Sequence, residues 1–227
     1  SEVEIIITGT EITLTPKLIA GGSSMTYKGL FDGTNGSTMG VSYDTSIVPA
    51  DAISSVTYMY RNSACTTGGY AVGLPKNVAS NVCNGAMTDV GTWDIKVQKF
   101  SMVVNGVDMT YKYIPTYATF VLTINKKDVT LSTVKAEKVY DGTTSVVLKD
   151  ITLTGAIEGE SPKLDNTFAR GAAFADATAG TNKPVTLGGD FKLAGIYDVN
   201  YRITNPQMAV TGIIKKADAQ LNVTPSK

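Results

Sequence analysis

The sequence contains no histidine, one tryptophan, two cysteines and three arginines among its 227 residues. Without histidine it has no Ser-His or Cys-His nucleophilic couple and no imidazole ligand for a metal ion. It also lacks a phosphate-binding glycine loop, a dinucleotide-binding glycine motif and a Gly-x-Ser-x-Gly nucleophile motif. We therefore expect a protein that is not an enzyme and that holds neither a cofactor nor a metal ion.

Long apolar runs are also missing, because no stretch approaches the roughly 20 apolar residues that span a membrane. The first residues carry Glu2 and Glu4 where a signal peptide carries basic residues, so we expect any targeting signal to lie upstream. Twenty Lys and Arg balance twenty Asp and Glu, which leaves no basic stripe for phosphates or an anionic membrane. We expect no nucleic-acid partner and no membrane insertion.

Short segments of alternating apolar and polar residues dominate what is present, as is typical of half-buried strands. They are Ile5–Ile7, Ile12–Leu14, Val56–Tyr60, Trp93–Val97, Phe120–Ile124, Val129–Leu131, Val185–Leu187 and Tyr197–Ile203. Turn dipeptides such as Asn105-Gly106 and Asp141-Gly142 separate them. No segment keeps a helical apolar period for more than about two turns. The pattern predicts an all-β protein with little helix, and its composition favours an exported one.

Internal repetition predicts the domain organisation. The segment INKKDVTLSTVK (124–135) has a near-copy in IIKKADAQLNVTPSK (213–227), and ITLTPK (12–17) resembles both. Each copy fits a last strand, a Lys-Lys joint and the first strand of the next module. We expect two immunoglobulin-like β-sandwich modules, 1–127 and 128–217, arranged end to end because the joint is short. Residues 1–11 would be an upstream remnant or edge strand, and 218–227 the start of a truncated next repeat.

Cys65 and Cys83 are the only cysteines, and a polar, glycine-rich stretch separates them within the longer first module. A disulfide between them would close this loop and stabilise the fold by about 3 kcal/mol. The alternative is two independent buried thiols. The export context favours the disulfide.

The segment KVYDGTTSVVL (138–148) resembles the signature of YDG repeats in large bacterial surface adhesins and filamentous-haemagglutinin-type exoproteins. The resemblance extends over nearly all of 129–217. The first module resembles the MBG-type modules that alternate with YDG repeats, through MTYKG (25–29), GTWDIKV (91–97) and ATFVLTINKKDV (118–129). The resemblance implies a stalk-like or adhesive array, secreted or on a bacterial surface, whose partner is a host or cell-surface protein or glycan. It supplies no catalytic residue.

Tyr140, Asp141 and Gly142 are expected to form a turn. The Tyr140 ring would pack into the end of the sandwich, Asp141 would cap backbone N–H groups, and Gly142 would supply a positive φ. The alternative makes Asp141 a calcium or ligand contact. We also expect Trp93 and Tyr197, each following a Gly-x pair, to open a strand and face the core.

A carbohydrate-binding module is the alternative function, and it would need exposed aromatic residues. Tyr111 and Tyr113 are the candidate ligand-facing residues, because alternate residues share one face of a strand. Tyr58, Tyr60 and Tyr117 belong to the same set, and an ordinary sheet face is the other interpretation of all five. In either case the chain is expected to be monomeric by itself and to belong to a longer array.

Overall fold

Strands make up nearly all of the regular structure in this computed structural model, as the alternation predicts. The structure describes residues 8–27, 39–65, 69–72, 90–165, 171–188 and 191–219. The predicted strand at Ile5–Ile7 lies outside these ranges. The chain divides into two compact units, residues 1–126 (the first unit) and 127–227 (the second unit). Each unit is described by itself below.

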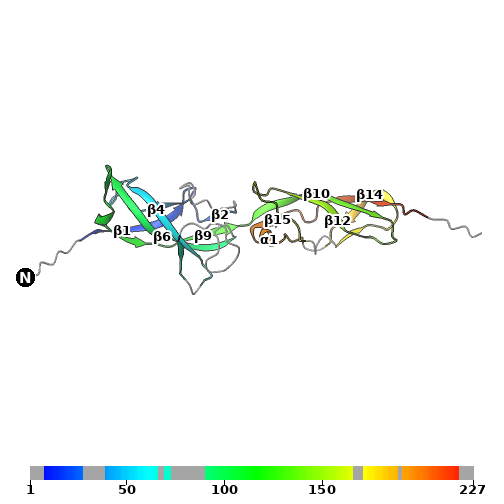
Figure 1. The fold of residues 1–227 in the computed structure, drawn as a ribbon, viewed down its shortest axis with the longest axis horizontal. Coiled ribbons are helices and arrows are strands. Elements are labelled where there is room, and N and C mark those ends of the chain that lie inside the picture. Colours follow the sequence, from blue (N-terminus) through cyan, green and yellow to red (C-terminus); the bar gives the residue numbers. More distant parts are fainter. Residues whose placement is uncertain are drawn as a thin grey trace, which may run out of the picture. The chain divides into compact units, whose positions relative to one another are not determined.

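Two sheets form the first unit (Figure 1). One has the order β3-β1-β8, with β1 at Thr10–Leu18, β3 at Met39–Ser42 and β8 at Tyr113–Tyr117. The other has the order β2-β9-β6-β4-β5, with β2 at Ser24–Thr26, β4 at Ile53–Asn62, β5 at Ala71–Val72, β6 at Gly91–Val104 and β9 at Phe120–Asn125. The short strand β7 (Val107–Asp108) returns along β6, and the 3-10 turn η1 (Thr110–Lys112) precedes β8.

Alternation along β6 builds the core of this unit. Trp93, Ile95 and Val97 are each 2% exposed or less. The Trp93 ring meets Tyr60 of β4 edge to face, with ring centroids 6.1 Å apart. Gly91 opens this strand and Trp93 is buried. The prediction that Trp93 would face the core at the start of a strand is therefore confirmed.

The second unit is organised by the long strand β10 (Lys127–Val139), which runs along its length in Figure 1. Its sheet has the order β11-β13-β14-β16-β10-β12, and β15 also pairs with β10. The strands are β11 Ser145–Val146, β12 Leu148–Thr154, β13 Ala172–Phe174, β14 Gly180–Thr186, β15 Tyr201–Ile203 and β16 Val210–Lys215. Ala136, Leu148, Phe174, Val185 and Ile214 lie in its buried core.

One edge of β10 changes partner along the strand. Lys127–Val129 pairs in parallel with β15, and Glu137–Val139 pairs in parallel with β16. Between these two ladders the side chain of Asn205 takes the place of a strand. Its amide nitrogen donates to the Leu131 carbonyl (3.0 Å), and its amide oxygen accepts from the Leu131 N–H (2.7 Å). The Asn205 side chain therefore supplies hydrogen-bond partners for the backbone N–H and carbonyl of Leu131, where β10 passes from one ladder to the next.

The two units share one strand order. The order β3-β1-β8 of the first unit corresponds to β12-β10-β15 of the second, and β2-β9-β6-β4-β5 corresponds to β10-β16-β14-β13-β11. In the first unit two separate strands, β1 and β2, form the parallel ladders that β10 alone forms in the second. The sequence repetition thus has a counterpart in the hydrogen-bonded order of the strands.

One predicted strand is wrong in its first half. Residues Ile196–Asn200 form the short helix α1, and only Tyr201–Ile203 are a strand. Tyr197 and Tyr201 are four residues apart, a spacing that places side chains on one face of a helix as well as of a strand. Their ring centroids are 6.2 Å apart, and the Asp198 carboxylate accepts the Leu193 N–H (3.2 Å) at the start of the turn. These local contacts favour the helical turn. Gly195 therefore precedes a helix and not the strand that was predicted.

Candidate functional site

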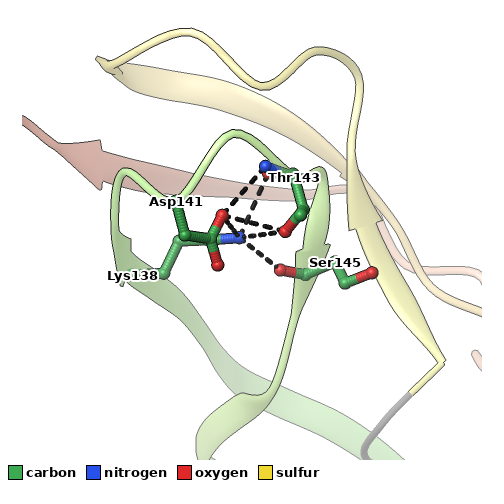
Figure 2. A network of polar contacts seen from close by, with 4 residues as sticks. All are labelled: Lys138, Asp141, Thr143 and Ser145. Atoms are coloured by element: carbon green, nitrogen blue, oxygen red, sulfur yellow. Dashed lines mark hydrogen bonds and ion pairs between the residues drawn. The ribbon is translucent and has the colours of Figure 1, made fainter.

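The turn after β10 holds a network of polar contacts around Lys138 (Figure 2). Asp141 Oδ1 accepts from the Thr143 N–H (2.9 Å) and from the Thr143 hydroxyl (2.8 Å). The Lys138 ammonium contacts the same Asp141 oxygen at 2.5 Å, and it donates to the carbonyl oxygens of Thr143 (3.1 Å) and Ser145 (2.8 Å). Gly142 has a φ of 77°, the left-handed conformation that the turn requires. The turn is the one expected of Asp141 and Gly142.

Lys138 lies on the inner face of β10. It is two residues beyond the buried Ala136, and across the ladder it pairs with Ile214, which is 2% exposed. Only 11% of the Lys138 side chain is exposed, so its aliphatic stem covers the end of the core while the ammonium reaches oxygen atoms. The Asp141 turn therefore neutralises a cation that the fold directs inward.

Strand β14 repeats this arrangement. The ammonium of Lys183, whose side chain is also 11% exposed, contacts Asp176 and the Thr178 hydroxyl, and Asp176 accepts from the Thr178 N–H at 2.9 Å. Lys183 is two residues from the buried Val185, so it too belongs to the inner face. Two Asp-x-Thr turns in the second unit thus each hold an inward lysine. Sequence analysis identified Asp141 but missed both lysines and the second turn.

Tyr140 does not pack into the end of the unit, and that expectation is wrong. The residue is 47% exposed. Its N–H donates to the Lys215 carbonyl (2.8 Å), so the backbone extends the hydrogen bonding with β16 by one residue beyond β10, while about half of the tyrosine stays exposed. Alternation along β10 directs Ala136 and Lys138 inward. The strand ends at Val139, so Lys138 is its last inward side chain and covers the end of the core in place of the tyrosine.

In the alternative role for Asp141, a calcium ion would have to compete with the Lys138 ammonium for the Asp141 carboxylate. The Lys138 ammonium already occupies the centre of the oxygen atoms that the turn presents. Asp44, which follows β3, accepts from the Ser46 N–H (2.8 Å) and hydroxyl (2.6 Å) in the same kind of turn. Within the ranges that the structure describes, no group of three or more His, Cys, Asp or Glu could hold a metal ion.

Hydrogen bonds lower the pKa of both turn carboxyls to about 2, with the contacts to Lys138 and Lys183 as the largest causes for Asp141 and Asp176 respectively. An unfolded Asp has a pKa of about 3.9, so the stabilisation is complete above about pH 4 and is lost as the pH falls towards 2. We expect D141N or D176N to reduce the slope of stability against pH in this window. Urea unfolding midpoints measured between pH 5 and pH 2 check this, with the exposed D218N as the matched control. An unchanged slope in both variants would contradict the prediction.

The candidate ligand-facing tyrosines do not share one strand face. Tyr111 lies in η1 and is 71% exposed, whereas Tyr113 opens β8 and is only partly exposed. Tyr58 and Tyr60 are each 7% exposed, because β4 turns them into the core. Burial raises the pKa of Tyr58 to about 12. The exposed aromatic residues that a sugar platform would need are therefore reduced to Tyr111 and the partly exposed Tyr113 and Tyr117 of β8.

Cys65 follows β4 and is 4% exposed, while Cys83 lies outside the described residues, so their pairing stays a prediction. We expect denatured but unreduced protein to take up no thiol reagent, and to take up two equivalents after reduction. Intact-mass spectrometry provides the measurement. Two labelled cysteines before reduction would establish independent thiols instead.

No helix among the described residues is both long and apolar enough to cross a membrane. Comparison with curated proteins and with solved structures finds no match. A comparison with family models does find one, over the part of the chain that begins at the end of β9 and includes the Lys138 turn, α1 and β15. Residues 125–209 contain a YDG domain.

Proposed function

We propose that this chain is a non-catalytic structural or adhesive segment of a bacterial repeat protein, secreted or displayed on the cell surface. Its two units are immunoglobulin-like sandwiches of the MBG and YDG types, arranged end to end. The shared strand order supports an array of related modules, and a single residue, Lys126, lies between the last strand of the first unit and the first strand of the second. So short a joint suits a stalk, for which we expect a radius of gyration above the compact value of about 17 Å.

One observation carries this proposal: in each unit, the last strand pairs in parallel with a strand from the start of the unit, which is β2 in the first unit and β10 in the second. Glu137–Val139 of β10 pairs with Ile213–Lys215 of β16, and Ser24–Thr26 of β2 pairs with Thr123–Asn125 of β9. Tension applied through the two ends of a unit then acts along these parallel strands. All hydrogen bonds of the ladder must break together under such a load, whereas a load across the ladder breaks them one at a time.

Single-molecule pulling tests this function. Stretching the whole chain by its termini should give two separate unfolding events, and unfolding of residues 127–215 should release roughly 300 Å of chain at about 3.4 Å per residue. Pulling a chain that carries V139C and K215C through those two sites loads the same ladder from one end, because the residues are neighbours across it. We expect a clearly lower unfolding force in this second geometry. Equal unfolding forces in the two pulling geometries, or forces too low to detect in both, would overturn the proposal that the parallel ladder resists tension.

A further inference from the structure

Strand β12 forms a free edge of the second unit. It pairs with β10 on one side and is the last strand in the order of its sheet. In an antiparallel ladder, the N–H and carbonyl of every second residue point away from the partner strand. Within the ranges that the structure describes, no strand pairs with this outer edge of β12. A free edge of this kind can accept a further strand from another chain.

A groove follows this edge. Residues of β12 and the segment 162–164 line it together. The lining includes Leu148, which pairs with the buried Ala136, and Lys149, which pairs with the exposed Lys135. Successive residues of a strand point to opposite faces, so a groove that touches both residues passes along the edge and not over one face. Because β10 occupies the other edge of β12, the groove lies at the free one.

The groove has a hydrogen-bonded wall and an apolar floor. The Ala194 N–H donates to the Lys163 carbonyl (2.8 Å), which holds the segment 162–164 in place. Leu148 is 5% exposed, and both it and Ile151 belong to the packing of the core. The groove volume of about 290 Å³ is at the lower limit for a pocket that encloses a small ligand. It suits a few side chains of an extended chain better than a whole small molecule.

The uncompensated charge of the groove is positive. Lys149 and Lys163 are exposed, and neither ammonium forms an ion pair in the described part of the chain. The carboxylate of Asp150, which also lines the groove, is neutralised by Lys135 at 2.8 Å. A second copy of β12 would bring the same lysines into the groove, and like charges across a ladder are destabilising. The charge therefore disfavours self-association and favours a partner with acidic side chains.

We propose that the groove beside β12 binds an extended acidic segment of a partner protein, which adds to the free edge as a further strand. Its backbone pairs with β12, its carboxylates meet Lys149 and Lys163, and its apolar side chains lie over Leu148 and Ile151. Backbone hydrogen bonds supply affinity in this mode of binding, and the alternate side chains supply specificity. The inference goes beyond the array function, because a β-module can bind such a segment whether or not it belongs to an array.

NMR titration of the isotope-labelled whole chain with a synthetic peptide tests the proposal. The probe EVEIEVEV, blocked at both ends, alternates acidic and apolar residues and is about as long as β12. We expect its addition to shift the amide signals of residues 148–154 and 162–164, and to leave those of the first unit unchanged. The basic peptide KVKIKVKV should bind at least about tenfold more weakly. The acidic peptide with every backbone nitrogen methylated keeps its charge but lacks N–H donors, and it should not bind.

Charge reversal in the groove separates recognition from folding. K149E/K163E should weaken binding of the acidic peptide by about tenfold or more, because each change removes an attraction and adds a repulsion. The same variant should bind the basic peptide more tightly than the unchanged chain does. K99E/K216E, at two exposed lysines outside the groove lining, alters the net charge equally and should retain the original affinity. K149Q/K163Q should give an intermediate affinity, and circular dichroism should show the same strand signal in every variant.

Three results would overturn the proposal. They are no binding of the acidic peptide at millimolar concentration, shifts confined to other residues, and an affinity of K149E/K163E equal to that of the unchanged chain. A heparin fragment that shifts residues 148–154 where the peptide does not would assign the groove to an anionic glycan instead, and would also overturn it. Each of these results leaves the array function standing, because the pulling experiment tests that function separately.

Discussion

N205A is expected to lower the free energy of unfolding of the second unit by about 2 kcal/mol. The side chain forms two hydrogen bonds to the backbone of Leu131, a residue that is 3% exposed. Leu131 pairs with β12 on one edge of β10, but neither β15 nor β16 pairs with it on the other edge, where Asn205 lies. Alanine leaves both the N–H and the carbonyl of Leu131 without these partners. The cost of unsatisfied backbone groups therefore adds to the loss of the bonds.

N205D separates the two bonds. An ionised carboxylate can still accept from the Leu131 N–H but cannot donate to the Leu131 carbonyl, so we expect this variant also to be destabilised near neutral pH. T211A, at an exposed position of β16, should change stability by less than about 0.5 kcal/mol and is the control. Urea unfolding followed by circular dichroism gives the measurement. Trp93, the only tryptophan, lies in the first unit, so its fluorescence should report an unchanged transition for that unit. Full stability of N205A would show that the amide is dispensable.

G212A should destabilise the second unit still more, by about 3 kcal/mol, through overpacking. A Cβ atom at residue 212 would lie 2.2 Å from the Ala136 carbonyl oxygen and 2.8 Å from the Phe174 ring. Neither neighbour can give way easily, because one is the backbone of β10 and the other is buried in the core. β16 therefore needs glycine for close approach rather than for an unusual backbone conformation.

G180A is the matched control, because it lies on the neighbouring strand β14 and has no positive φ. Its Cβ would meet only the flexible Lys183 side chain, at 3.5 Å. We expect a change below about 0.5 kcal/mol, since alanine also reduces the freedom of the unfolded chain. Thermal unfolding of the three proteins compares them directly. Equal melting temperatures for G212A and the unchanged chain would contradict the predicted clash.

The local sequence was sufficient for the strands and turns that depend on neighbouring residues. Alternation placed Trp93 and Ile95 inside, and Asn105-Gly106 adopts the positive φ values of 50° and 79° that a tight hairpin between β6 and β7 requires. Asp141 and Gly142 form their turn for the same reason, since their partners are one or two residues away. The YDG resemblance likewise depends on a contiguous segment, and a YDG domain is found there.

The alternation of apolar and polar residues did not predict the structure correctly where a residue spacing fits both a helix and a strand. It also failed where the burial of a side chain depends on residues distant in the sequence. Tyr197 and Tyr201 fit a strand and a helix equally, and the contact of Asp198 with Leu193 decided for a helical turn. Tyr140 was expected inside because it is aromatic. β10 instead ends at Val139, so Lys138 is the last inward side chain of the strand, and Asp141 neutralises it.

The sequence by itself determined the all-β class, the repetition, and the Asp-Gly and Asn-Gly turns, because strand alternation and turn chemistry involve residues close together in the chain. Only the tertiary structure decided which strands pair, and so revealed that both units share one strand order. It also decided that Asn205 forms hydrogen bonds with Leu131, 74 residues away. The close approach of Ala136 and Phe174 to Gly212, which leaves no room for a Cβ atom, is likewise a feature of the tertiary structure. Such contacts join segments remote in the sequence, and their geometry exists only once the sheets have formed.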